Sequence, residues 1–254
     1  MTATFGAVGC AGETDADVEE IQSAITSDNA LSANALSANA LSANALSANA
    51  LSANALSANA LSANALTASA LSDPLAREFL RYVVSCALDE NDGFSMRIDG
   101  KKYDFPGGLG LAPEWGRSRG SCDGECQRWV SACMLARVDA AGVKRIISLR
   151  GDHPALKPEG SELRKYTDRE ATYFGNVFVP KQPRFLCLSP GKTDDERVCG
   201  DSMRDCPMTV VGWCDEACAD DDGPYGSFGD CSDKGRERHG NIYHEAITVF
   251  LPKQ

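Results

Sequence analysis

The sequence predicts an α+β domain cross-linked by disulfides and preceded by a short β-helix of five-residue repeats. Three observations support this fold class. The chain has 254 residues and eleven cysteines, ten of them beyond residue 85. One five-residue unit recurs without change over residues 31–65. Residues 76–254 alternate helical and β-type hydrophobic patterns with segments rich in Gly, Pro and Asp.

The composition is that of a globular protein with an acidic surface. Hydrophobic residues make up 43% and charged residues 24% of the chain, which are ordinary values. The net charge of −11 argues against nucleic acid as a partner, because phosphate binding needs clustered Lys and Arg. No apolar run approaches the roughly 18 residues of a membrane helix. We predict no cofactor, and the sequence leaves the oligomeric state open.

The cysteines favour disulfides over metal binding. Zinc sites usually combine two closely spaced cysteine pairs or add histidines. The close pairs here, Cys122/Cys126 and Cys214/Cys218, lie far apart, and the chain has three histidines. Cys126 and Cys133 share one face of a predicted helix, so each is expected to bond to another element. The pairing stays open, and the predicted disulfide cysteines are Cys86, Cys122, Cys126, Cys133, Cys187, Cys199, Cys206, Cys214, Cys218 and Cys231.

The eleventh cysteine follows three small residues. Ala7-Val8-Gly9-Cys10 resembles the lipobox of bacterial lipoproteins, whose cysteine is lipidated and becomes the mature N-terminus. The resemblance implies that residues 1–10 are a truncated signal with Cys10 as lipidation site, and that the true start lies upstream of Met1. It also implies a membrane partner through the lipid anchor and a place in the cell envelope, as an outer-membrane, cell-surface or secreted protein. A chance Gly-Cys in a cytosolic protein is the alternative.

Residues 11–25 are predicted to be an acidic linker or capping helix, and residues 26–75 form the repeat. A spacing of five scatters leucines around an α-helix and sends alternate leucines to opposite faces of a strand. A coil with five residues on each side instead stacks leucine over leucine.

This spacing resembles the pentapeptide-repeat family, whose members form a right-handed, four-sided β-helix. The resemblance covers residues 26–75 and implies a short right-handed β-helix of pentapeptide-like repeats, although a disordered spacer is an alternative. The leucines that match the central position of the family repeat are Leu31, Leu36, Leu41, Leu46, Leu51, Leu56, Leu61, Leu66 and Leu71.

The disulfide-rich α+β domain is assigned to residues 76–254. Asp73 and Pro74 are read as N-cap and first residue of a helix, and Asp123 as the N-cap of a second. Asp99-Gly100 predicts a tight hairpin turn between strands at 94–98 and 101–105. Further strands are expected at 143–149, 173–179, 208–213 and 247–251.

One motif suggests nucleophilic catalysis. Gly116-Arg117-Ser118-Arg119-Gly120 fits G-x-S-x-G, with Ser118 as nucleophile and His153, His239 or His244 as base. That motif needs a strand immediately before it and a helix immediately after it. The preceding segment is rich in Gly and Pro, so a surface loop is the alternative, and we assign no catalytic residue.

The acidic segment near residue 220 suggests a cation site. Asp220, Asp222 and Asp230 could supply oxygen ligands to calcium, although a solvated acidic loop is the alternative and we assign no metal. His239 and His244 near Glu245 could form a metal pair, but they lack a metalloprotease spacing.

These features predict a surface-anchored, non-catalytic binding or structural lipoprotein, in which the repeat is a spacer for a cysteine-rich head. An extracellular glycan or protein is the expected ligand. The alternatives are a secreted hydrolase that uses Ser118 and a self-assembling surface structural protein, because a short β-helix has open edges. A glycan-binding surface, or else core, is expected from Tyr173, Phe174, Phe178, Trp213, Tyr225 and Phe228.

Overall fold

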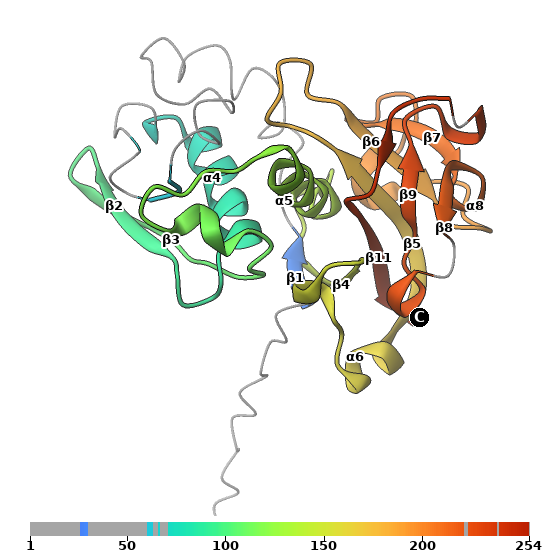
Figure 1. Ribbon diagram of the computed structural model, residues 1–254, viewed down its shortest axis with the longest axis horizontal. Coiled ribbons are helices and arrows are strands. Elements are labelled where there is room, and N and C mark those ends of the chain that lie inside the picture. Colours follow the sequence, from blue (N-terminus) through green and yellow to red (C-terminus); the bar gives the residue numbers. More distant parts are fainter. Residues whose placement is uncertain are drawn as a thin grey trace, which may run out of the picture.

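The computed structural model describes residues 26–29, 60–62, 66, 71–220, 223–237 and 239–253 (Figure 1). The predicted lipidation site Cys10, the segment 11–25, most of the repeat and Asp222 lie outside these residues. The described part is a mixed α/β structure with several disulfides, so the coarse fold class is confirmed.

Strands and helices are interspersed along the chain. The strands are β1 (Thr26–Asn29), β2 (Phe94–Ile98), β3 (Lys101–Phe105), β4 (Arg145–Arg150), β5 (Tyr166–Gly175), β6 (Arg184–Leu188), β7 (Thr209–Trp213), β8 (Cys218–Asp220), β9 (Gly229–Ser232), β10 (Ile242–Tyr243) and β11 (Ala246–Pro252). The α-helices are α4 (Pro74–Ala87), α5 (Gly124–Ala136), α6 (Gly160–Lys165), α7 (Glu196–Cys199) and α8 (Cys214–Ala217). Short 3-10 helices are η3 (Pro113–Gly116), η4 (Pro154–Leu156), η5 (Pro224–Gly226) and η6 (Gly235–Glu237).

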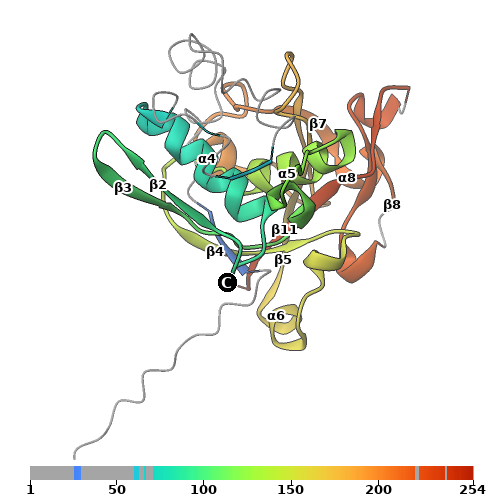
Figure 2. The ribbon, with the colours of Figure 1, turned by 60° about the vertical axis from the view of Figure 1, so that its left-hand side comes forward.

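A six-stranded sheet is the centre of the fold. Its strand order is β1-β4-β11-β5-β6-β7, and all neighbours are antiparallel except β6 and β7. Helix α5 packs on β5 and β11, and α4 packs on α5, so both helices lie on one side of the sheet (Figure 2). A second sheet, β10-β9-β8, lies at the β6–β7 end of the molecule (Figure 1).

The two faces of the central sheet bury separate cores. Tyr173, Leu186 and Ile247 face the main core, which α4 and α5 complete. Their chain neighbours Phe174, Cys187 and Ala246 point to the other face, because successive side chains alternate across a strand. There they meet the second sheet, which contributes Cys218, Cys231 and Tyr243. The fold is therefore layered as helices, central sheet and small sheet.

Local capping signals explain both long helices. The Asp73 carboxylate accepts a hydrogen bond from Leu75 N at 2.9 Å, and Pro74 is the first helical residue. The Asp123 carboxylate accepts from Cys126 N at 3.0 Å at the start of α5. Both predicted helix starts and the 94–98/101–105 hairpin are confirmed.

Of the remaining strand predictions, those at 208–213 and 247–251 agree with β7 and β11 to within one residue, and that at 143–149 agrees with β4 to within two. The strand expected at 173–179 spans Tyr166–Gly175, and β6 at Arg184–Leu188 was missed. The register between β5 and β11 shifts, because Thr248 pairs with Thr172 whereas Phe250 pairs with Arg169. The extra residue in β5 is a β-bulge, which interrupts the alternation that the prediction relied on.

Two described parts of the predicted repeat segment, 26–75, are attached to the domain. Strand β1 pairs with β4 at the edge of the central sheet, with Thr26 opposite Ser148. At the other end, Leu61, Leu66 and Leu71 are buried in the main core, and Leu61 N donates to Trp115 O at 2.8 Å. Described residues at both ends of the 26–75 segment therefore contact the disulfide-rich domain.

All ten predicted cysteines form disulfides. Cys133 of α5 bonds to Cys86 of α4, as expected for an inward-facing cysteine. The prediction for Cys126 was wrong, because it bonds to Cys122, four residues earlier, at the half-exposed first turn of α5. The other pairs are Cys187–Cys214, Cys199–Cys206 and Cys218–Cys231.

A buried ionic network joins α7 to β5 and to the end of α5. The Arg197 guanidinium lies 2.5 Å from the Glu170 carboxylate and donates to the carbonyls of Ala136 and Val138 at 2.8 and 2.7 Å. Tyr173 donates its hydroxyl hydrogen to Asp195, the N-cap of α7. Burial, together with the charge of Glu170, raises the pKa of Asp195 to about 6.

Asp195 should make stability depend on pH. Its pKa of about 6 in the folded protein lies above its ordinary value of 3.8, so the folded state binds more protons between these values. The contribution of Asp195 to the free energy of unfolding is therefore largest below about pH 4 and falls as the pH rises to about 6. Chemical denaturation from pH 4 to 7 should show this fall in the difference between the native protein and Asp195→Asn. A constant difference would contradict the assignment.

Candidate functional site

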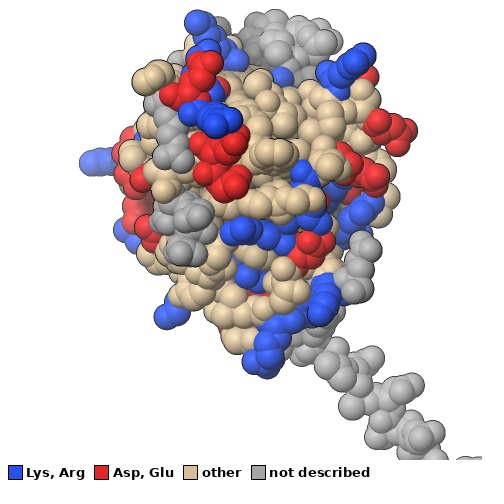
Figure 3. Space-filling model, turned by 90° about the vertical axis from the view of Figure 1, so that its right-hand side faces the viewer, with Lys and Arg blue, Asp and Glu red and all other residues tan. Residues whose placement is uncertain are grey.

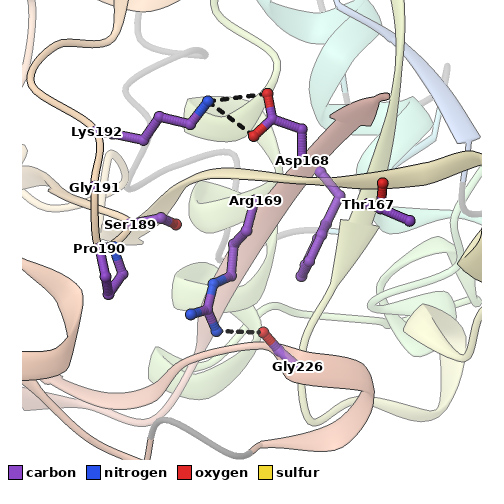
Figure 4. A pocket seen from close by; sticks show the side chains of 9 residues that line it. Thr167, Asp168, Arg169, Ser189, Pro190, Gly191, Lys192 and Gly226 are labelled. Atoms are coloured by element: carbon purple, nitrogen blue, oxygen red, sulfur yellow. Dashed lines mark hydrogen bonds and ion pairs between the residues drawn. The ribbon is translucent and has the colours of Figure 1, made fainter. Parts of the chain in front are cut away.

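An open groove of about 510 Å³ lies where the first residues of β5 meet two loops (Figure 4). It is lined by residues 167–169 of β5, by the loop 189–192 after β6, and by Gly226 and Phe250. We call it the groove. Its volume falls within the range of small-ligand sites.

A charged pair spans the groove. Lys192 Nζ lies 2.8 Å from Oδ1 and 2.9 Å from Oδ2 of Asp168, and each side chain is about one-third exposed. Figure 4 shows the two side chains meeting across the space between the loop and β5. The pair presents hydrogen-bond donors and acceptors side by side to a ligand.

Two arginines hold one wall of the groove. Arg169 donates to Gly226 O at 3.1 Å, and its guanidinium lies 4.2 Å from the centroid of the Phe228 ring. Arg150 donates to Tyr225 O at 3.2 Å and lies 3.7 Å from the centroid of the Phe250 ring. The carbonyls of two successive residues of η5 are thus each held by an arginine.

This wall contains a strained residue. Tyr225 has φ +62°, in the left-handed region that non-glycine residues rarely adopt, and Gly226 follows with φ +78°. Such strain of about 1–3 kcal/mol persists where surrounding contacts hold it, and it is concentrated at binding sites. The Tyr225 side chain is 38% exposed beside the groove residue Gly226.

The opposite wall contains an unsatisfied hydroxyl. Ser189 is 1% exposed, and its Oγ has no hydrogen-bond partner within the described part of the chain. A buried polar atom without a partner costs about 1–3 kcal/mol, so such atoms are usually satisfied by water or a ligand. The Ser189 hydroxyl is inaccessible to solvent and lies behind the surface of the groove.

Basic residues precede the groove strand in a chain that is acidic as a whole. Arg164 and Lys165, both exposed, end α6 directly before β5, and Lys253 N donates to Lys165 O at 3.2 Å. Figure 3 shows Lys and Arg predominating over the lower half of the side of the molecule at the right of Figure 1. With Arg169 and Lys192 against Asp168, the groove itself carries one net positive charge. Its electrostatics favour an anionic ligand.

The surroundings of Ser118, the predicted nucleophile, are not those of a nucleophile elbow. Ser118 is exposed in a turn after η3, and α5 begins only at Gly124. The strand and helix that a nucleophile elbow requires are not adjacent to it. His153 is half-buried against the Trp129 ring, at 5.0 Å between centroids, and its Nδ1 accepts from Ala155 N. Burial lowers the pKa of His153.

The other candidates belong to the small sheet and its loops. His239 is exposed, and His244 Nδ1 lies 2.5 Å from Asp230 Oδ1. Glu245 instead accepts two hydrogen bonds from Arg128 of α5, at 2.6 and 2.7 Å. The Asp220 backbone pairs with Gly229, beside Asp230. The Asp230 carboxylate is thus paired with the His244 ring.

The aromatic candidates divide into two groups. Four of them, Tyr173, Phe174, Phe178 and Phe228, are at most 1% exposed and belong to the cores. Trp213 and Tyr225 are 52% and 38% exposed. The core alternative therefore holds for four residues of six.

The groove residues were not among the predicted site residues. Ser189-Pro190-Gly191 is typical of a turn, and the charged start of β5 lacks a strand pattern. A signal was present only in the basic residues Arg164, Lys165 and Arg169, which lie within six positions of each other.

Metal-ligand spacing occurs elsewhere. Cys187, Cys218 and Cys231 are the one group of described residues with ligand atoms close enough to share an ion.

None of the described helices is long and apolar enough to cross a membrane. Comparisons of this chain with protein-family models, with curated proteins and with solved structures find no match.

Proposed function

We propose that the chain is an exported, surface-anchored binding protein whose disulfide-rich domain binds acidic saccharides in the groove. Five disulfides support export, because disulfides persist in oxidising compartments. Since residues at both ends of the 26–75 segment contact the domain, residues 11–25 rather than the repeat would connect the domain to a lipid at Cys10.

The observation that carries the proposal is the set of polar groups around the groove. Sugar hydroxyls both donate and accept hydrogen bonds, so the adjacent Asp168 carboxylate and Lys192 ammonium suit two neighbouring hydroxyls. The net positive charge of the groove favours a sugar that also carries a carboxylate or sulfate. Tyr225 offers an exposed ring, on which the apolar face of a sugar ring could pack.

The test uses two variants that are expected to act in opposite directions. Lys192→Gln removes a charged donor, so it should weaken binding of an acidic saccharide about tenfold. Asp168→Asn removes a negative charge that repels the anionic saccharide, so it should strengthen that binding about two- to fivefold. An array of saccharides with uronate, sialate or sulfate groups, each beside its neutral parent, identifies the ligand, and calorimetry gives the affinities.

Matched controls lie far from the groove in the sequence. Lys102 and Asp104 form an exposed ion pair of 2.8 Å on the β2–β3 hairpin, so Lys102→Gln and Asp104→Asn should leave binding unchanged. Absence of binding to every acidic saccharide refutes the proposed ligand class, and equal effects of Lys192→Gln and Lys102→Gln refute the proposed site.

A further inference from the structure

We propose that, in the reduced chain, Cys187, Cys214, Cys218 and Cys231 bind one zinc ion, which the two disulfides replace on oxidation. This inference concerns a site separate from the groove and does not depend on the groove's ligand. Two disulfides, Cys187–Cys214 and Cys218–Cys231, lie close together in the fold.

Four elements bring these cysteines together. Cys187 lies on β6, Cys214 begins α8, Cys218 begins β8 and Cys231 lies on β9, and these elements gather at one end of the molecule (Figure 1). Cys187 and Cys231 thus supply, beside the closely spaced Cys214 and Cys218, the second cysteine pair that zinc sites require. That pair comes from sequence positions too distant to form a recognisable motif.

The distances between three of the four sulfurs suit tetrahedral zinc, and Cys214 Sγ, which is bonded to Cys187 Sγ and lies outside this group, would turn toward the ion when the disulfide is reduced. Cys187 Sγ and Cys218 Sγ are 3.7 Å apart, and the sulfurs of Cys187, Cys218 and Cys231 all lie within 4.8 Å of one another. Zinc–sulfur bonds of about 2.3 Å in a tetrahedron place sulfurs about 3.8 Å apart. Both sulfurs of the 3.7 Å contact belong to disulfides and carry no hydrogen, so a hydrogen bond cannot explain their proximity.

The surroundings suit a structural metal rather than a catalytic one. All four cysteines are at most 2% exposed, and they pack in one core with Phe174, Ala217 and Phe228. An apolar shell excludes water, so four protein thiolates would close the coordination sphere, as in structural zinc sites.

The exchange balances with a dithiol as reductant. Two dithiol molecules reduce the two disulfides to four thiols and become two disulfides themselves. Zinc then displaces four protons as it binds four thiolates. In the reverse direction, two molecules of a disulfide oxidant take four electrons from the thiolates, re-form both protein disulfides and release Zn²⁺.

The experiment reduces the full chain in the presence of Zn²⁺ alone, removes unbound metal without oxidation and measures zinc per chain. One zinc is expected for the native sequence and less than one-fifth of that for Cys214→Ser/Cys218→Ser. The matched control is Cys122→Ser/Cys126→Ser, which removes a pair with identical spacing and should still hold one zinc. The Co²⁺ form should show the visible absorption of tetrahedral thiolate coordination.

Alkylation followed by mass spectrometry gives a readout that does not require every variant to fold. Zinc should protect the four proposed ligands, whereas the other six domain cysteines react. Zinc content below one per chain, equal losses in both double variants, or protection spread over all ten cysteines each overturn the proposal.

Discussion

Replacing Arg197 with methionine is expected to lower the free energy of unfolding by about 3–5 kcal/mol. Arg197 is 4% exposed and neutralises Glu170 while satisfying the carbonyls of Ala136 and Val138. Its removal leaves a buried carboxylate without a countercharge and two carbonyls without donors. Urea denaturation monitored by tryptophan fluorescence measures the loss.

The comparison with two further variants separates this network from ion pairs in general. Arg197→Met/Glu170→Gln removes the orphaned charge together with its partner, so it should be clearly more stable than Arg197→Met alone. Lys102→Met breaks an ion pair whose side chains are 60% and 63% exposed, and should change stability by less than about 1 kcal/mol. Similar losses for Arg197→Met and Lys102→Met would show that burial does not govern the effect.

The same network fixes the strand that forms the groove. Glu170 belongs to the buried network, whereas the preceding residue, Arg169, contacts Phe228 and Gly226 beside the groove. The β-bulge between the Thr248–Thr172 and Phe250–Arg169 pairs places Arg169 on the same face as Thr172. The bulge therefore determines which of these two adjacent charged residues enters the buried network and which one faces the groove.

Local signals explain why some elements were predictable. The caps Asp73 and Asp123 and the turn Asp99-Gly100 act within a few residues, and the predicted helix starts and hairpin match the structure. Asp99 and Gly100 both have positive φ, at 50° and 79°, as this type of turn requires. Such positions need no information from the rest of the chain.

The groove was not predictable because its walls come from three distant segments. Asp168, Lys192 and Gly226 acquire a common role only through the pairing of β5 with β6 and β11. The same reason applies to the four-cysteine neighbourhood, where Cys187 and Cys231 lie 44 positions apart. Hydrophobic periodicity reports which face of an element is buried, but it does not report which elements meet.

The disulfide pairing could not be derived from cysteine positions, and its energetic consequences differ from pair to pair. Replacing Cys86 and Cys133 together by alanine should lower the free energy of unfolding by about 4 kcal/mol, because the bond closes a long loop in the unfolded chain. The two cysteines are 47 residues apart and fully buried between α4 and α5. Denaturant unfolding under non-reducing conditions measures the loss.

Cys122→Ala/Cys126→Ala is the matched comparison, because this disulfide also involves α5 but spans only four residues. Loop-closure entropy then predicts a loss of about 2 kcal/mol, roughly half that of the long-range pair. The order of the two losses tests whether a constraint on the unfolded chain dominates. If the short-range pair costs as much as the long-range pair, the stabilisation must instead come from contacts within the folded domain, and the α4–α5 interface would hold without its covalent link.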